Sequence, residues 1–341
     1  MEIESLLEEM IRREASDLHL TADAPAFLRT EGMLERQEWI SKGVLDAWLS
    51  QALPHASERC SGAVDGIDFS LTFHDRRFRG NAFLTEGAMA VALRLLPERI
   101  PSLSEIGATS SMEMLTQARQ GILLAVGRTG AGKSTTLAAL LMALANHRTA
   151  SGQGLHCITL EDPIEFRYHA EGCLFHQREL GRDFSSFAAA IRDALREDPD
   201  VLLISELRDC ATIRAALAAA EAGTLVLSTL HARTAAEAPQ RLSDFFPAEE
   251  RSGIRAALAS SLEAVLAQRL VPTKTGRRAV FEVLLRTPAV CRMIHDGDDA
   301  QLVSAMLAGA REGMTTFAQE GRRLASLGAL SRDALPLLEA R

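Results

Sequence analysis

Two different patterns of hydrophobic and polar residues follow one another along the chain. In residues 2–14 apolar side chains recur at helical spacing, which predicts an amphipathic helix at the start. After it, short alternating runs predict strands, and a less regular apolar stretch predicts a second helix. The expected strands cover 17–20, 27–29, 67–73, 78–83 and 89–96, and the second helix covers 44–53. These elements predict a small α/β domain.

From about residue 105 the pattern changes to apolar runs that alternate with helical stretches. The expected strands cover 122–126, 157–160, 201–204 and 225–228, and the helices between them cover 134–146, 184–197 and 210–222. Buried strands separated by helices indicate a mainly parallel sheet with helices on both faces. The segment 288–341 is rich in Ala and Leu and predicts several further helices.

The two patterns predict two domains in an α/β chain. The first covers residues 1–98, a linker that contains Pro101 covers 99–104, and the second covers 105–341 with 288–341 as a helical tail. A chain of 341 residues has the length expected for two domains.

Composition narrows the function classes. Apolar residues make up 47% of the chain, enough for packed cores, so wholesale disorder is excluded. The net charge is −8, which disfavours nucleic acid as the main partner. The five cysteines form no CxxC pair, so the sequence predicts no zinc ribbon. The chain has neither a signal-peptide pattern nor an apolar run long enough to cross a bilayer, which predicts a cytoplasmic protein whose membrane association is peripheral.

Residues 127–134 read GRTGAGKS and match the phosphate-binding pattern GxxxxGK[ST]. The match follows a predicted strand and opens a predicted helix, as the motif requires. Glycines let backbone N–H groups converge on phosphate oxygens at a helix N-terminus. Lys133 is expected at the β- and γ-phosphates, and the Ser134 hydroxyl is expected to ligate Mg²⁺. The predicted ATP-binding residues are Gly127, Thr129, Gly130, Ala131, Gly132, Lys133, Ser134 and Thr135.

Two acidic strand ends accompany this loop. Residues 200–206 read DVLLISE, an apolar strand that ends in a carboxylate, and Glu206 can hold Mg²⁺, directly or through water, or polarise the attacking water. Residues 160–165 read LEDPIE, where a carboxylate can act as general base; the alternative is a surface turn set by Pro163. His231 ends the next strand and is either a nucleotide sensor or a structural residue.

These motifs, in this order and spacing, resemble the secretion ATPase superfamily of type II secretion and type IV pilus systems, and most of all its PilT-like retraction branch. The likeness runs over nearly the whole chain. It covers ASDLHL at 15–20, STTLAA at 134–139, the Asp box ITLEDPIEF at 158–166, ALREDPD at 194–200, ELRD at 206–209, the His box TLH at 229–231 and FPAEE at 246–250.

The resemblance implies a PAS-like N-terminal domain, a RecA-like ATPase domain and a ring-shaped homohexamer. It also implies roles for residues: Glu161 becomes the catalytic base and His231 the sensor. Members of the family place two arginines, fifteen residues apart, where they reach nucleotide phosphates, and Arg79 and Arg94 match that spacing.

A second arginine pair, four residues apart, acts from the neighbouring subunit in the family, and Arg192 and Arg196 match it on one expected helical face. A planar, permanently charged guanidinium is suited to stabilise a transferring phosphoryl group. The chain has only three lysines among its 37 basic residues, so it is rich in arginine, and the alternative for each of these four is an ordinary surface residue.

Three stretches depart from the family pattern. The strand 200–206 with Glu206 at its end is the Walker B motif of the family, in which Gly usually precedes the Glu; this chain has Ser205 there. Arg128 stands in the phosphate-binding loop at a position where Pro is frequent. The retraction branch carries AIRNLIRE near its C-terminus, whereas residues 289–296 here read AVCRMIHD. The apolar pattern and the acidic end are kept, but the basic positions have changed.

The leading hypothesis is a hexameric Mg²⁺-dependent ATPase that converts ATP hydrolysis into domain rotation and drives type IV pilus retraction. Its partners would be an inner-membrane platform protein of the pilus and a paralogous ATPase, and its place the cytoplasmic side of the bacterial inner membrane. One alternative is a pilus extension or type II secretion ATPase, although those members usually carry a further N-terminal domain and a four-cysteine zinc module. Another is an accessory ring subunit that binds nucleotide without hydrolysing it. A nucleic-acid translocase is disfavoured by the acidic balance.

Overall fold

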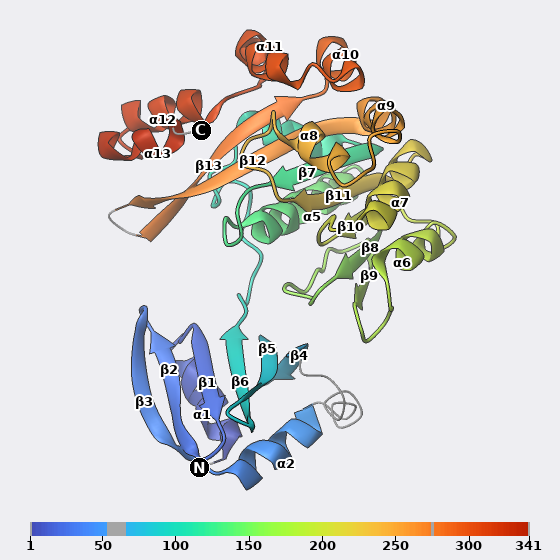
Figure 1. Ribbon diagram of the computed structural model, residues 1–341. Coiled ribbons are helices and arrows are strands. Elements are labelled where there is room, and N and C mark those ends of the chain that lie inside the picture. The colour runs from blue at the N-terminus through green and yellow to red at the C-terminus, as the bar shows by residue number, and fades with distance from the viewer. Residues whose placement is uncertain (1, 53–65, 274–275, 340–341) are drawn as a thin grey trace. The chain divides into compact units, whose positions relative to one another are not determined.

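A computed structural model describes residues 2–52, 66–273 and 276–339, and the chain forms two compact units (Figure 1). One unit contains Met1–Arg99 together with Pro163–Arg167, and the other contains Ile100–Asp162 and Tyr168–Arg341. Within the described part of the chain, no helix has both the length and the apolar character needed to span a membrane.

The N-terminal unit is built on a six-stranded antiparallel sheet with the order β3-β2-β1-β6-β5-β4. Its strands are β1 (Asp17–Thr21), β2 (Ala24–Thr30), β3 (Met33–Ile40), β4 (Ile67–Phe73), β5 (Arg76–Thr85) and β6 (Ala88–Leu95). Helices α1 (Ile3–Arg12) and α2 (Lys42–Ala52) pack against β1 and contact each other. The apolar stripe of α1, including Leu6 and Met10, is fully buried, as its spacing predicts.

The predicted strands of this unit are confirmed, but β3 was missed. Most of its side chains are exposed, and only Ile40 is buried, because β3 lies at the edge of the sheet and, among the described strands, pairs with β2 alone. A strand of this kind has no buried face to impose an alternating pattern on its sequence. The second predicted helix is also confirmed as α2; residue 53, its expected end, lies outside the described residues.

The C-terminal unit is built on a seven-stranded sheet with the order β13-β12-β7-β11-β10-β8-β9. All neighbouring pairs in it are parallel except β12 and β13. The strands are β7 (Gly121–Val126), β8 (His156–Glu161), β9 (Leu174–Glu179), β10 (Val201–Ile204), β11 (Leu225–Leu230), β12 (Leu262–Thr273) and β13 (Gly276–Leu285). The prediction of a mainly parallel sheet is therefore confirmed.

Helices cover both faces of this sheet. Ile122, Leu124 and Val126 of β7 belong to one apolar core with α7 (Cys210–Glu221) and α9 (Arg251–Ser261). The alternate residues Leu123 and Ala125 point to the opposite face, where α5 (Lys133–Ala150) packs on β7 and β11. Because every β7 residue is buried, its sequence is a continuous apolar run.

The remaining elements show where the sequence pattern was ambiguous. Strands β9, β12 and β13 were not predicted: β9 is polar at the sheet edge, and the LEAVLAQRLV run of β12 fits a helix as well as a strand. The helical tail is confirmed as α10 (Pro288–Asp296), α11 (Leu302–Ala308), α12 (Phe317–Ser326) and α13 (Pro336–Glu339). Helix α6 (Phe187–Ala194) is shorter than predicted, because the Ser186 side chain caps its start.

Candidate active site

The four predicted motifs meet at one edge of the C-terminal sheet. Strands β7, β11, β10 and β8 are neighbours and parallel, so their carboxyl ends point the same way. Val126 pairs with Leu230, and Ile204 pairs with both Ser228 and Leu160. The residues that follow these positions are the phosphate-binding loop, His231, Glu206 and Glu161. Loops at the carboxyl edge of a parallel sheet are where α/β proteins bind their ligands.

The phosphate-binding loop follows β7 and ends where α5 begins, as predicted. Gly132 is the residue before α5 and has φ +88°, a left-handed conformation that favours glycine. Gly127 needs the absence of a side chain for another reason: a Cβ there would lie 2.7 Å from the carbonyl oxygen of Gln268. Thr129 and Gly130 are exposed, whereas Ala131 is buried under the loop. No side chain caps the start of α5, so no side-chain oxygen at the N-cap accepts from its first backbone N–H groups.

Gln268 on β12 contacts both this loop and the start of α5, a role that the sequence analysis did not predict. Its side chain is buried, and its Oε1 accepts a 2.6 Å hydrogen bond from Thr136 Oγ1 in the first turn of α5. Its Nε2 lies where a Cβ on Gly132 would approach within 2.9 Å. One side chain thus contacts the loop and fixes the start of α5. The contact spans 132 positions of sequence, so no local pattern could predict it.

A Gln268→Ala variant is expected to weaken both stability and nucleotide binding. It leaves the buried Thr136 hydroxyl without an acceptor, which costs about 1–3 kcal/mol in the free energy of unfolding. Chemical denaturation and the dissociation constant for ADP measure the two effects. Gln301→Ala, which truncates an exposed glutamine in the helical tail, is the matched control and is expected to change neither. Unchanged ADP affinity in Gln268→Ala would contradict the supporting role.

Lys133 begins α5 and turns back over the loop. Its Nζ donates to the carbonyl oxygens of Gly127 and Arg128, at 3.0 and 3.1 Å. Burial lowers the pKa of Lys133, and the Glu206 carboxylate opposes that shift. The ammonium is held beside the loop by these two carbonyl oxygens. Ser134 and Thr135 follow it in the first turn, and Ser134 is exposed.

Glu206 lies at the centre of a charged cluster. Its Oε1 lies 2.8 Å from His231 Nε2, and its Oε2 accepts a hydrogen bond from Arg208 Nε at 2.9 Å. Arg208 also donates to Asp162 Oδ2 at 3.2 Å, and this ties the Walker B strand to the Asp box. The sequence motifs predicted Glu206 and His231 as site residues, but they assigned no role to Arg208 or Asp162. Hydrogen bonds with two carboxylates raise the pKa of Arg208 despite burial, so its positive charge is fixed.

Glu161 ends β8 in a buried position beside this cluster. Its Oε1 accepts hydrogen bonds from Thr159 Oγ1 at 2.6 Å and from Gln177 Nε2 at 3.1 Å. Both of these donors are neutral, whereas Glu206 is hydrogen-bonded to an arginine. The alternative of a plain surface turn does not describe this carboxylate, because Glu161 is only 5% exposed.

Arg79 and Arg94 lie in the N-terminal unit. Fifteen residues separate them in sequence, yet they are directly paired across β5 and β6, so their side chains leave the same face of the hairpin. Arg94 Nε donates to Asp17 Oδ1 at 2.9 Å, and Arg79 Nη2 lies 3.9 Å from Asp68 Oδ2. The fifteen-residue spacing of the two arginines thus places them opposite each other in the β5–β6 hairpin. The two arginines are adjacent; Arg79 is half-buried and Arg94 is exposed.

Arg192 and Arg196 do not share a helical face as expected. Helix α6 includes Arg192 but ends at Ala194, so Arg196 lies beyond the helix, where it pairs with Asp193 at 3.4 Å. The segment turns there because Asp198 adopts a positive φ of 56°. Both arginines are exposed.

The oxygen ligands at the sheet edge suit Mg²⁺. P-loop proteins hold this ion with few protein ligands and with the phosphates of the bound nucleotide. The Ser134 hydroxyl and the Glu206 carboxylate are the groups that fit. In keeping with this, no cluster of three or more His, Cys, Asp or Glu side chains that could hold a metal by itself occurs within residues 2–52, 66–273 and 276–339.

Comparisons with known proteins show the family to which this chain belongs. The family described as "Type II/IV secretion system protein" matches residues 1–335. "Uncharacterized protein YggR" of Escherichia coli (strain K12) is 43% identical over 325 residues, which cover 94% of this chain and 97% of that protein. "Type IV pilus retractation ATPase PilT" of Pseudomonas aeruginosa is 37% identical over 337 residues, 98% of this chain and 96% of that protein. The crystal structure of the pilus retraction motor PilT with bound ADP matches with a TM-score of 0.88 at 32% identity, covering 100% of this chain and 98% of that one.

Proposed function

The chain belongs to the type II/IV secretion system protein family, and we propose that it is a PilT-like, hexameric ATPase motor that drives the retraction of type IV pili. The observation that carries this proposal is the meeting of the phosphate-binding loop, Glu206, His231 and Glu161 at one sheet edge. A complete set of hydrolytic groups argues for an enzyme rather than for an accessory subunit that only binds nucleotide.

The reaction we propose is in-line attack of water on the γ-phosphate of ATP. Lys133 and the backbone N–H groups at the start of α5 bind the phosphates. Ser134 and Glu206 would hold Mg²⁺, which supplies positive charge at the β- and γ-phosphate oxygens when bound. His231, whose Nε2 lies 2.8 Å from Glu206 Oε1, would sense whether the γ-phosphate is present. Arg208 keeps the Glu206 carboxylate oriented from the other side.

Glu161 is the better candidate for the general base. Oε2 of Glu206 accepts a hydrogen bond from the Arg208 guanidinium, its Oε1 lies 2.8 Å from His231 Nε2, and the same carboxylate is our proposed Mg²⁺ ligand. The Glu161 carboxylate is instead buried at the end of β8, where the Thr159 hydroxyl and the Gln177 amide donate to its Oε1. A base must also reach the attacking water, and catalytic hydrogen bonds commonly form only once substrate is bound.

The chain path offers a way to couple hydrolysis to movement. Asp162 belongs to the C-terminal unit, and the next residue, Pro163, begins the short segment that belongs to the N-terminal unit. Within the N-terminal unit, buried Arg77 donates from Nη2 to the carbonyl oxygen of Ile164 at 2.9 Å. The Asp box is therefore continuous with the other unit, and a displacement of Glu161 or Asp162 would be carried into it.

The ring and its partners complete the proposal. We place the protein as a homohexamer at the cytoplasmic face of the bacterial inner membrane, where it would act on a platform protein of the pilus, with a paralogous ATPase as a further partner. Arg79, Arg94, Arg192 and Arg196 would reach nucleotide phosphates, the last two from the neighbouring subunit.

A second candidate is pilus extension or type II secretion, and one observation favours it. The stretch 289–296, which forms most of α10, lacks the basic pattern of the retraction branch. In its place His295 Nδ1 lies 2.8 Å from Asp296 Oδ1, so a local pair occupies the end of the helix. The absence of a four-cysteine module from the sequence argues against this candidate.

Deletion of the gene in the native host tests the proposal. Retraction predicts cells with long pili that do not shorten and do not support twitching. Cells without pili would instead indicate extension, and unchanged pili with a secretion defect would indicate type II secretion. Complementation with the wild-type chain is the control that assigns the phenotype to this protein.

A further inference from the structure

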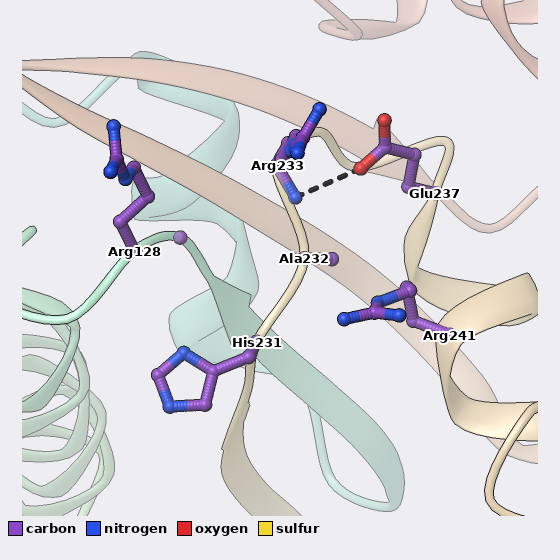
Figure 2. A pocket seen from close by; sticks show the side chains of 7 residues that line it. Arg128, His231, Ala232, Arg233, Glu237 and Arg241 are labelled. Carbon is purple, nitrogen blue, oxygen red and sulfur yellow. Dashed lines mark hydrogen bonds between the residues drawn. The ribbon is translucent and has the colours of Figure 1, made fainter.

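A cavity, called here the second cavity to distinguish it from the nucleotide site, opens beside the phosphate-binding loop on the side of His231. Its volume is about 320 Å³, and it is lined by Gly127, Arg128, His231, Ala232, Arg233, Glu237 and Arg241 (Figure 2). Of the phosphate-binding loop, only Gly127 and Arg128 contribute to this lining among the described residues. Lys133 and Ser134 do not line it, so the cavity flanks the nucleotide site, with which it shares Gly127 and His231.

The cavity is strongly positive. Arg128 comes from the loop after β7, Arg233 from the segment after β11, and Arg241 from α8 (Ala238–Ser243), and Figure 2 shows all three side chains around the same space. None of these three guanidinium groups makes an ion pair within the described part of the chain. Other exposed arginines of the unit behave differently: Arg208 and Arg214, for example, each pair with a carboxylate.

The one acidic residue of the lining does not neutralise the arginines. Glu237 Oε2 accepts a 3.0 Å hydrogen bond from the backbone N–H of Arg233, the contact drawn in Figure 2. Three guanidinium groups against one carboxylate leave a formal charge of about +2, with His231 counted as neutral. An anion that enters the cavity is attracted by the guanidinium groups that line it.

The segment that carries Arg233 is held in place. Its Ala235 N–H donates to Glu282 Oε1 at 2.7 Å, and Glu282 Oε2 accepts from the N–H of Phe317 at 3.1 Å. Glu282 is buried, so this anchor reaches into the core from β13. This anchor fixes the backbone two residues after Arg233, which lowers the cost of ordering that segment when an anion binds.

We propose that this cavity is a second oxyanion site, beside the phosphate-binding loop (the P-loop), and that it receives inorganic phosphate after hydrolysis. His231 connects the two sites, because it lines the cavity and its Nε2 lies 2.8 Å from Glu206. Guanidinium groups bind phosphate oxygens through charge-assisted, paired hydrogen bonds. The volume exceeds that of a phosphate ion and leaves room for several waters, each of which occupies about 30 Å³ in the liquid. This inference rests on the proposed ATPase function.

Binding of radiolabelled inorganic phosphate to the full chain tests the proposal while Mg²⁺ and a non-hydrolysable ATP analogue saturate the P-loop. The analogue fills the γ-phosphate position, so bound label reports the second site alone. We expect one phosphate per chain, and at least about tenfold weaker binding in Arg233→Gln/Arg241→Gln, because each change removes a charge-assisted hydrogen-bond donor.

A matched control separates local from general charge effects. Arg214→Gln/Arg311→Gln removes the same charge from exposed positions on α7 and in the helical tail, and it is expected to bind phosphate like the wild type. Unchanged analogue binding in the Arg233/Arg241 variant shows that it is folded. No phosphate binding beside the analogue, or equal binding in both double variants, would overturn the second site. Failure of the analogue itself to bind would instead count against the proposed ATPase function.

Discussion

A Lys133→Ala variant is expected to lose ATP hydrolysis, with kcat reduced by at least about 100-fold, the effect of removing one preorganised charge from a phosphoryl-transfer site. Lys133 is the first residue of α5, and its ammonium is already held over the loop by the carbonyls of Gly127 and Arg128. No other lysine occurs near it in sequence, and a guanidinium does not replace a compact ammonium there. Phosphate release from Mg²⁺·ATP by the purified protein measures the loss.

Lys42→Ala is the control for this prediction. Lys42 is exposed at the start of α2 in the N-terminal unit, so its truncation removes the same charge far along the chain from the P-loop. This control is expected to hydrolyse ATP at the wild-type rate. Undiminished hydrolysis by Lys133→Ala would refute the assignment of the nucleotide site.

Glu161→Gln is expected to keep ATP binding and to lower kcat by about 10²–10⁴-fold, the usual contribution of a general base. The amide keeps the shape of the side chain and its contacts with Thr159 and Gln177 in β8 and β9, but it cannot accept a proton. Single-turnover hydrolysis and equilibrium binding of ATP, measured together, separate the chemical step from affinity.

Glu206→Gln distinguishes the roles of the two carboxylates. Since Glu206 is the proposed Mg²⁺ ligand, this variant is expected to need a higher Mg²⁺ concentration for half-maximal activity, whereas Glu161→Gln is not. Glu171→Gln, an exposed glutamate after the Asp box, is the neutral control. If Glu206→Gln alone removed the chemical step while Glu161→Gln retained full kcat, the assignment of the base would be reversed.

Much of the fold could be predicted, because its buried strands and amphipathic helices leave strong patterns. The run Ile122–Val126 and the stripe of α1 are examples in which burial itself dictates the residue types. Elements without a buried face, such as β3, and apolar runs that fit two periodicities, such as β12, could not be assigned. Capping also escaped prediction: Ser186 starts α6 later than the apolar pattern suggests, and the early end of that helix separates Arg196 from Arg192.

The candidate site divides in the same way. Residues that lie within short motifs, such as Lys133 and Glu206, were found because their spacing is fixed by a strand, a turn and a helix. Gln268 and Arg208 were not, since each acts through partners that lie far away in sequence, Thr136 and Asp162. The three arginines of the second cavity come from separate segments, and only the folded chain brings them together.

The central claim is that hydrolysis at this site powers pilus retraction, and the most direct measurement follows labelled pili on living cells. The native host would carry Glu161→Gln in place of the wild-type gene, so that the protein is present but does not turn over. The account predicts that pili still extend and that shortening events are lost, while the wild-type gene restores them. Normal shortening rates in the variant, or cells that form no pili, would contradict it.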